Sequence, residues 1–217
     1  MIPSLGYNGT IAQAYEQGPE VGKSIQMNNK AIEQASGPYT YIPDFLPQPQ
    51  EAFDALWREL AWQRRGSTPR REYYANDVPV PYVYGKGAGV REYLPQTWHP
   101  LMRDIQKRLE AHCGCRFEVC FLNGYENQSD HLGWHADDSP EMDDERPIAI
   151  VSLGVAREIW FCPQNNTKDV QKQLLQPGSL CLMHAGVQDT HFHRIPKAGF
   201  LCGERISLTF RGYVTSE

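Results

Sequence analysis

The sequence predicts an α+β fold in which two N-terminal helices pack on a C-terminal β-sandwich or jelly roll. Apolar residues follow the helical spacing only before residue 116, and short β-type runs separated by turn residues come after it. Short strands at this spacing, without helices between them, are typical of a sandwich or jelly roll and not of βαβ units. The length of 217 residues fits one such domain.

The first helix is predicted over residues 50–62, where one helical face is apolar: Phe53, Leu56, Trp57 and Leu60. A second helix starts near Pro100, which suits the first helical turn, and ends before Gly114. Residues 1–38 are rich in glycine, glutamine and asparagine and show no sustained period. We therefore expect a loosely ordered extension, followed by one domain over residues 39–217.

Six short runs after Arg116 are predicted as strands: 117–125, 147–154, 158–162, 180–184, 190–195 and 205–214. Between the two helices, residues 66–97 are interrupted by proline and glycine and contain arginines and several tyrosines. Here we expect short hairpins and loops instead of regular core.

Composition narrows the classes of function. The formal net charge is −5, so a protein that holds polyphosphate by bulk electrostatics is not indicated, although a local basic patch stays open. The sequence has no run of about 18 apolar residues and begins without a basic, apolar leader, so neither a membrane helix nor a secretory signal is expected. We expect a soluble intracellular monomer, cytoplasmic or nuclear.

His135 and Asp137 form the first candidate site. In an extended strand, residues two apart point to the same face, about 6.6 Å from each other. A second pair, His191 and His193, lies in another predicted strand. One imidazole from that pair would complete two nitrogens and one carboxylate, the set that holds Fe(II) and leaves positions open for a co-substrate and dioxygen. Ordinary polar residues can also form a His-x-Asp pattern, so both interpretations stay open.

The last predicted strand alternates in character. One face carries two arginines and two hydroxyls: Arg205, Ser207, Thr209 and Arg211. This face suits a polar pocket for an anion, because each guanidinium could pair with one end of a short dicarboxylate. A solvated outer face is the alternative.

Five segments occur in order along residues 39–214: Asn123-Gly-Tyr125, Asp130-His-Leu-Gly-Trp-His135-Ala-Asp137-Asp138, Pro147-Ile-Ala-Ile-Val-Ser-Leu-Gly154, His193-Arg-Ile-Pro-Lys197 and Arg205-Ile-Ser-Leu-Thr-Phe-Arg211. Together they resemble the AlkB family of Fe(II)- and 2-oxoglutarate-dependent dioxygenases. The fold of that family is a double-stranded β-helix, which agrees with the jelly roll predicted from strand spacing.

The resemblance implies a role for each matching residue. Three residues would ligate Fe(II), with His193 selected over His191: His135, Asp137 and His193. Two arginines would hold the ends of the 2-oxoglutarate site: Arg205 at the distal carboxylate and Arg211 at the end near the metal. Three further residues would line the co-substrate: Asn123, Tyr125 and Ser207, the last where the family usually has asparagine.

The resemblance also implies a reaction, the oxidative demethylation of N-alkylated bases in nucleic acid, with Fe(II), 2-oxoglutarate and dioxygen. It is of the DNA-repair type that acts on 1-methyladenine and 3-methylcytosine. The base must arrive on a single strand or be flipped out of a duplex. Residues 66–97 stand where the family has its nucleotide-recognition lid, although an ordinary surface hairpin is the alternative. The expected substrate contacts are Arg70, Arg71, Tyr82, Tyr84 and Asp138.

Two other functions stay open. The same oxygenase chemistry could act on a protein side chain or another small molecule, which the acidic balance favours slightly and the arginine–tyrosine segment opposes. A jelly-roll metal-binding or scaffolding protein without turnover is the second. Trp134, next to His135, is expected either in a pocket wall or in the core.

Overall fold

The computed structural model describes residues 34–66, 68–84 and 90–214 of the chain. Of the extension expected over residues 1–38, residues 1–33 lie outside the described residues. Its last part contains a strand, β1 (Gln34–Ser36), which pairs antiparallel with β2 (Tyr39–Ile42). The sheet therefore begins shortly before residue 39, the predicted start of the domain.

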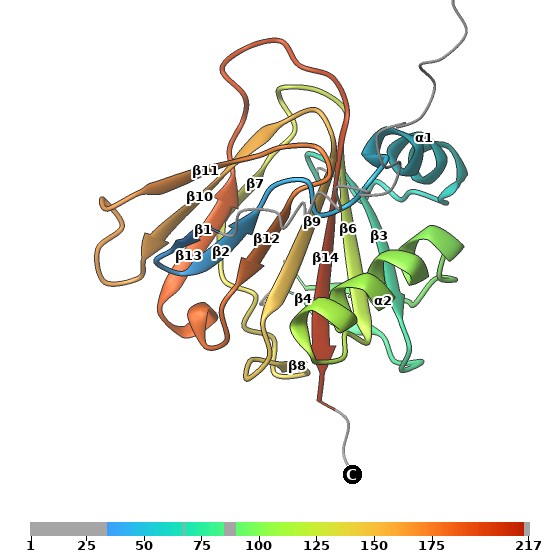
Figure 1. The fold of residues 1–217 in the computed structure, drawn as a ribbon, viewed down its shortest axis with the longest axis horizontal. Helices are drawn as coiled ribbons and strands as arrows, with labels where there is room; N and C mark the ends of the chain where they lie inside the picture. The colour runs from blue at the N-terminus through green and yellow to red at the C-terminus, as the bar shows by residue number, and fades with distance from the viewer. Residues whose placement is uncertain (1–33, 67, 85–89, 215–217) are drawn as a thin grey trace, which may run out of the picture. The chain divides into compact units, whose positions relative to one another are not determined.

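Two large antiparallel sheets, with one small two-stranded sheet beside them, build the described domain (Figure 1). The larger sheet contains, in spatial order, β1, β2, β12 (Leu180–Met183), β9 (Ile148–Gly154), β14 (Arg205–Tyr213), β6 (Val119–Tyr125) and β3 (Arg71–Asn76), with β8 (Met142–Asp143) beside β14. The smaller sheet contains β11 (Gln171–Leu175), β10 (Arg157–Pro163), β13 (His191–Ile195) and β7 (Leu132–His135). The chain passes from β9 to β10 and β11, back to β12, across to β13 and back to β14. This winding between two sheets confirms the predicted jelly roll, a double-stranded β-helix.

Both predicted helices cover the larger sheet (Figure 1). Helix α1 (Pro49–Glu59) contacts β9 and β14. Helix α2 (Pro100–Cys113) buries Met102, Ile105 and Leu109 in the cluster that also holds the apolar face of β14. It ends at Gly114, whose φ of 69° is a left-handed conformation that glycine adopts without steric cost. Within the described residues, no helix is long and apolar enough to cross a membrane.

The six strands predicted after Arg116 are all found, with ends displaced by at most two residues. Three short strands are additional to these six: β7, β8 and β11. The sequence of β11, Gln171-Lys-Gln-Leu-Leu175, is mostly polar and does not predict a strand. Strand β11 lies at the edge of the smaller sheet, where one side of a strand has no neighbour and polar residues are tolerated.

The segment over residues 66–97 is more regular than its sequence predicts. Strand β3 pairs along its full length with β6, and its Tyr73 and Tyr74 are buried. The expectation of loops is wrong here because the prolines and glycines flank β3 and do not interrupt it. The expected short hairpin is present further along, as β4 (Tyr82–Tyr84) paired with β5 (Arg91–Tyr93). Residues 85–89, between these two strands, lie outside the described residues.

Candidate active site

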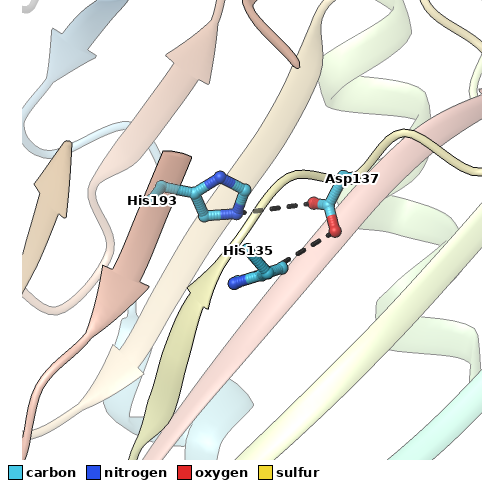
Figure 2. A group of neighbouring side chains, drawn as sticks. All are labelled: His135, Asp137 and His193. Atoms are coloured by element: carbon cyan, nitrogen blue, oxygen red, sulfur yellow. Dashed lines mark ion pairs between the residues drawn. The ribbon is translucent and has the colours of Figure 1, made fainter. Parts of the chain in front are cut away.

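Three predicted ligand residues meet in one cluster (Figure 2). His193 on β13 lies directly across from His135 on β7, so strand pairing brings the two imidazoles together. Asp137 follows β7 and turns its carboxylate toward both rings. Its Oδ1 lies 3.6 Å from Nε2 of His135, and its Oδ2 lies 3.6 Å from Nε2 of His193. The candidate ligand atoms all lie within 4.8 Å of one another, close enough to share one metal ion.

Hydrogen bonds orient this cluster. Nδ1 of His135 lies 2.9 Å from the carbonyl oxygen of Gly133, so an N–H at Nδ1 can donate to it and leave the Nε2 lone pair toward Asp137. The backbone N–H of Asp137 donates to Oε1 of Gln188 at 2.9 Å. Gln188 is buried and belongs to the short helical turn η2 (Val187–Asp189). Sequence analysis missed it, because nothing in its local pattern marks it.

The electrostatics of the cluster favour metal binding. Burial lowers the pKa of His135 and lowers that of His193 to about 3, so both imidazoles stay neutral near pH 7. Burial by itself would raise the pKa of Asp137, but Arg211 and the two histidines outweigh it and hold the pKa below its ordinary value. Nη2 of Arg211 lies 2.6 Å from Oδ1 of Asp137. Two neutral imidazoles and one carboxylate are the ionisation states that a divalent metal requires.

The polar face of β14 lies inside the protein and not in solvent. All four of its residues are buried: Arg205, Ser207, Thr209 and Arg211. Across the strand pair, Arg205 lies opposite Tyr125, and Ser207 lies opposite Asn123. The alternative of a solvated outer face is therefore excluded, and the predicted co-substrate residues share one polar interior.

Arg205 is fully buried, and only part of its guanidinium has a hydrogen-bond acceptor. Its Nε donates to Oγ of Ser152 at 3.0 Å, a partner that sequence analysis did not find. Its Nη1 and Nη2, and the hydroxyl of Tyr125, have no hydrogen-bond partner among the described residues. Burial lowers the pKa of Arg205 to about 10, which leaves it charged at neutral pH. A buried cation with open donors fits a carboxylate, so these residues fit one end of 2-oxoglutarate.

A cavity opens beside the metal-ligand cluster. It is lined by Arg70, Tyr82, Tyr93, Phe121, Asn123, Leu132, His135, Asp137 and Arg211. Arg70 is buried, and its Nε donates to Oδ1 of Asn123 at 2.6 Å. Its Nη2 forms an ion pair with Oε1 of Glu72 at 2.8 Å. Tyr93 joins this network by donating its hydroxyl to Oε2 of Glu72 at 3.1 Å.

The predicted substrate contacts do not all reach this cavity. Arg70 and Tyr82 line it, whereas Arg71 lies on the other face of the strand, where its Nε donates to Oε1 of Glu126 at 2.7 Å. Asp138 is exposed and does not line the cavity. The backbone of Tyr84 belongs to β4, but its side chain lies outside the described part of the chain. Sequence analysis did not single out Glu72, Tyr93 or Phe121 for this site.

Comparison with known proteins agrees with this geometry. The sequence model of the 2OG-Fe(II) oxygenase superfamily matches residues 38–211. The chain is 28% identical over 174 residues to the DNA oxidative demethylase ALKBH2 of Mus musculus, covering 76% of this chain and 71% of that protein. It is 29% identical over 174 residues to the alpha-ketoglutarate-dependent dioxygenase alkB homolog 3 of Homo sapiens, covering 73% of this chain but only 59% of that protein.

A solved structure titled "The structure of OsALKBH1" has the same fold. Its TM-score is 0.60 at 17% identity, and the match covers 84% of this chain and 100% of that one. The similarity to these two relatives confirms the resemblance to the AlkB family. Because the superfamily match extends over most of the chain, this protein belongs to the 2OG-Fe(II) oxygenase superfamily, whose members use Fe(II) and 2-oxoglutarate.

Proposed function

We propose that this oxygenase removes alkyl groups from the nitrogens of nucleic-acid bases by oxidation, with dioxygen as the second co-substrate. The observation that carries the proposal is the cavity beside the metal-ligand cluster, because it combines three aromatic side chains with a buried arginine: Tyr82, Tyr93, Phe121 and Arg70. Aromatic rings hold a base by stacking, and a guanidinium hydrogen-bonds to its polar edge. The DNA oxidative demethylase named among its relatives supports the same substrate class.

In this proposal the chain's residues divide the work. His135, Asp137 and His193 hold Fe(II), which supplies the oxidising chemistry when it is bound with 2-oxoglutarate and dioxygen. Arg205 binds the distal carboxylate of 2-oxoglutarate. Arg211 keeps Asp137 ionised and closes the end of the site near the metal. Asn123, Tyr125 and Ser207 complete the polar wall of the co-substrate pocket.

The segment over residues 66–97 then acts as the nucleotide-recognition lid of one domain that spans residues 39–217. Its described part supplies Arg70, Tyr82 and Tyr93 to the cavity. Stacked contacts give this wall a fixed shape, since the rings of Tyr82 and Tyr93 lie 6.0 Å apart at 28°. The target base would enter from a single strand or after being flipped out of a duplex.

An oligonucleotide that carries 1-methyladenine or 3-methylcytosine tests the proposal. It is incubated with Fe(II), ascorbate and air, with and without 2-oxoglutarate, and its mass is followed by mass spectrometry. We expect the loss of one methyl mass only with 2-oxoglutarate, and no loss with the Asp137→Ala variant. If succinate accumulates while the oligonucleotide is unchanged, the oxygenase is active but methylated bases are not its substrate, and protein side chains or small molecules would be tested next.

A further inference from the structure

The outer face of the smaller sheet carries a row in which tryptophans and cations alternate. The row consists of Trp134 on β7, Arg194 on β13, Trp160 on β10 and Lys172 on β11. The guanidinium of Arg194 lies 5.3 Å from the ring centre of Trp134 and 4.8 Å from that of Trp160. The amino group of Lys172 lies 4.3 Å from the ring centre of Trp160. We call these four residues the tryptophan–cation row.

Strand register builds this row. Trp160 lies directly across from Arg194 on one side and from Lys172 on the other, and β13 also pairs with β7. The four strands are consecutive in the smaller sheet (Figure 1). Neighbouring strands lie about 4.8 Å apart, so the row extends roughly 14 Å across the sheet. This length exceeds the rise of one nucleotide, about 3.4 Å in a stacked strand.

The cations of the row form no ion pair with a described residue, although one carboxylate, that of Glu158, lies beside the ring that both contact. Neither Arg194 nor Lys172 forms an ion pair with a carboxylate of any described residue, and Nε of Arg194 is buried without a hydrogen-bond partner among them. The one acid of β10, Glu158, accepts a hydrogen bond from Nε1 of Trp160 at 2.7 Å. At one end of the row Trp134 is 39% exposed, so it lies neither in a pocket wall nor in the core, the two positions that its sequence context predicts.

The row begins at the strand that borders the cavity. β7 contributes Leu132 and His135 to the cavity lining, while Trp134 between them contacts Arg194 on the outer face. On β13, His193 belongs to the metal-ligand cluster and the next residue, Arg194, belongs to the row. The same two strands therefore carry the metal-ligand histidines and, at adjacent positions, one end of the row.

We propose that the tryptophan–cation row binds the single-stranded nucleic acid that flanks the target base. Unpaired bases stack on the exposed ring of Trp134, while Arg194 and Lys172, which lie against the ring of Trp160, attract the phosphates, a combination that holds single strands without sequence preference. A duplex cannot use the row in this way, because its bases are already stacked. This inference rests on the proposed function and adds a preference for single-stranded substrate with several nucleotides beside the lesion.

Two variants test the row away from the strand that carries His193. Trp160→Ala removes the ring against which both cations lie, and Lys172→Gln removes one charge. Lys107→Gln on α2 is the matched control, since that side chain is 76% exposed on another element. The probes are fluorescently labelled oligothymidylates of four and fifteen nucleotides, a fifteen-base-pair duplex and polyglutamate, titrated against the full-length protein.

We expect the fifteen-nucleotide strand to bind wild-type protein more tightly than the four-nucleotide strand or the duplex. Trp160→Ala weakens binding of the long strand about tenfold, because both cations lose the cation–π contact that positions them. Lys172→Gln lowers the slope of log affinity against log salt by about 0.7, the value for one phosphate contact to a single strand. The Lys107→Gln control matches wild type.

Three results would overturn the inference. If wild-type protein demethylates a methylated fifteen-nucleotide strand and both row variants bind and demethylate it equally well, the row does not bind nucleic acid, while the proposed function stands. If polyglutamate binds at the row in preference to the long strand, the partner is an acidic protein. If wild-type protein neither binds nor demethylates any strand, the proposed function fails together with the row. Unchanged demethylation of a short methylated strand by both variants shows that they are folded.

Discussion

The two ends of the cavity are built in different ways. At the end where we place the metal ligands and 2-oxoglutarate, most side chains come from paired strands, and strand register sets their positions, as with Arg205 across from Tyr125 and His193 across from His135. At the proposed substrate end, Arg70 precedes β3, and Tyr82 and Tyr93 come from a short two-stranded hairpin. Under the proposed function, the chemistry therefore depends on the body of the fold, and substrate choice depends on a small attached element.

Asp137→Asn should have the largest effect, because it removes the carboxylate that both histidines face. Loss of a residue that only supports a metal ligand costs about 10–100-fold, so loss of the ligand itself should cost more than about a hundredfold in turnover. Succinate formation per bound iron measures the effect. Near-normal succinate formation by this variant would show that Asp137 is not a metal ligand.

Arg205→Met should weaken the binding of 2-oxoglutarate without lowering the thermal stability of the protein. Removing one partner of a buried charge pair costs about 2–5 kcal/mol of binding free energy, so the affinity for 2-oxoglutarate should fall at least about thirtyfold. Without 2-oxoglutarate, the melting temperature should stay the same or rise, because Nη1 and Nη2 of Arg205 have no partner among the described residues.

Thr209→Val is the matched control for Arg205→Met, since Thr209 is buried on the same face of β14. It should leave 2-oxoglutarate affinity unchanged in a calorimetric titration. Equal losses of affinity in the two variants would mean that general packing of this face, and not the guanidinium, determines binding.

Glu72→Gln tests whether the substrate end of the cavity can be altered without changing the other end. Glu72 is buried and holds both Arg70 and Tyr93, so losing its charge should leave Arg70 less well placed in the cavity. A hydrogen bond to a charged group contributes about 1.5 kcal/mol or more, which predicts roughly tenfold slower demethylation. Succinate formation without nucleic acid should keep its wild-type rate. If both rates fall together, the two ends of the cavity are not independent.

Tyr82→Phe should have the smallest effect. The change keeps the aromatic wall and removes a hydroxyl that lies 3.0 Å from Oγ of Ser139 and 3.4 Å from Nη1 of Arg211. A neutral hydrogen bond of this kind contributes about 0.5–1.5 kcal/mol, so the variant should unfold at a slightly lower urea concentration. Demethylation should persist, because stacking is retained. Tyr82→Ala, in contrast, should weaken oligonucleotide binding.

The same contrast explains what the sequence can predict. Alternation along residues 205–211 and the spacing of His135 and Asp137 are local patterns, so the residues alone predict the polar strand face and two of the candidate ligands. The choice of His193 over His191 depends on the resemblance to the family. Contacts between distant segments leave no local pattern. The contacts of Gln188 with the Asp137 backbone and of Ser152 with Arg205 therefore cannot be predicted from the sequence.

The substrate end is harder to predict for a related reason. Arg70 and Arg71 are neighbours in the sequence, and both are expected to contact the substrate. Adjacent residues in an extended chain point to opposite sides, so only Arg70 reaches the cavity while Arg71 pairs with Glu126. The face that each arginine takes depends on how β3 pairs with β6, which is a long-range property.

The most direct test of the account is the ratio of methyl groups lost to succinate formed on a single-stranded oligonucleotide with one 1-methyladenine or 3-methylcytosine. Mass spectrometry measures the first quantity and an enzymatic succinate assay measures the second. For wild-type protein we expect equal amounts after the succinate formed without oligonucleotide is subtracted, and for Glu72→Gln we expect succinate in excess of methyl loss. Succinate from wild-type protein with no loss of methyl from the oligonucleotide would contradict the proposed function.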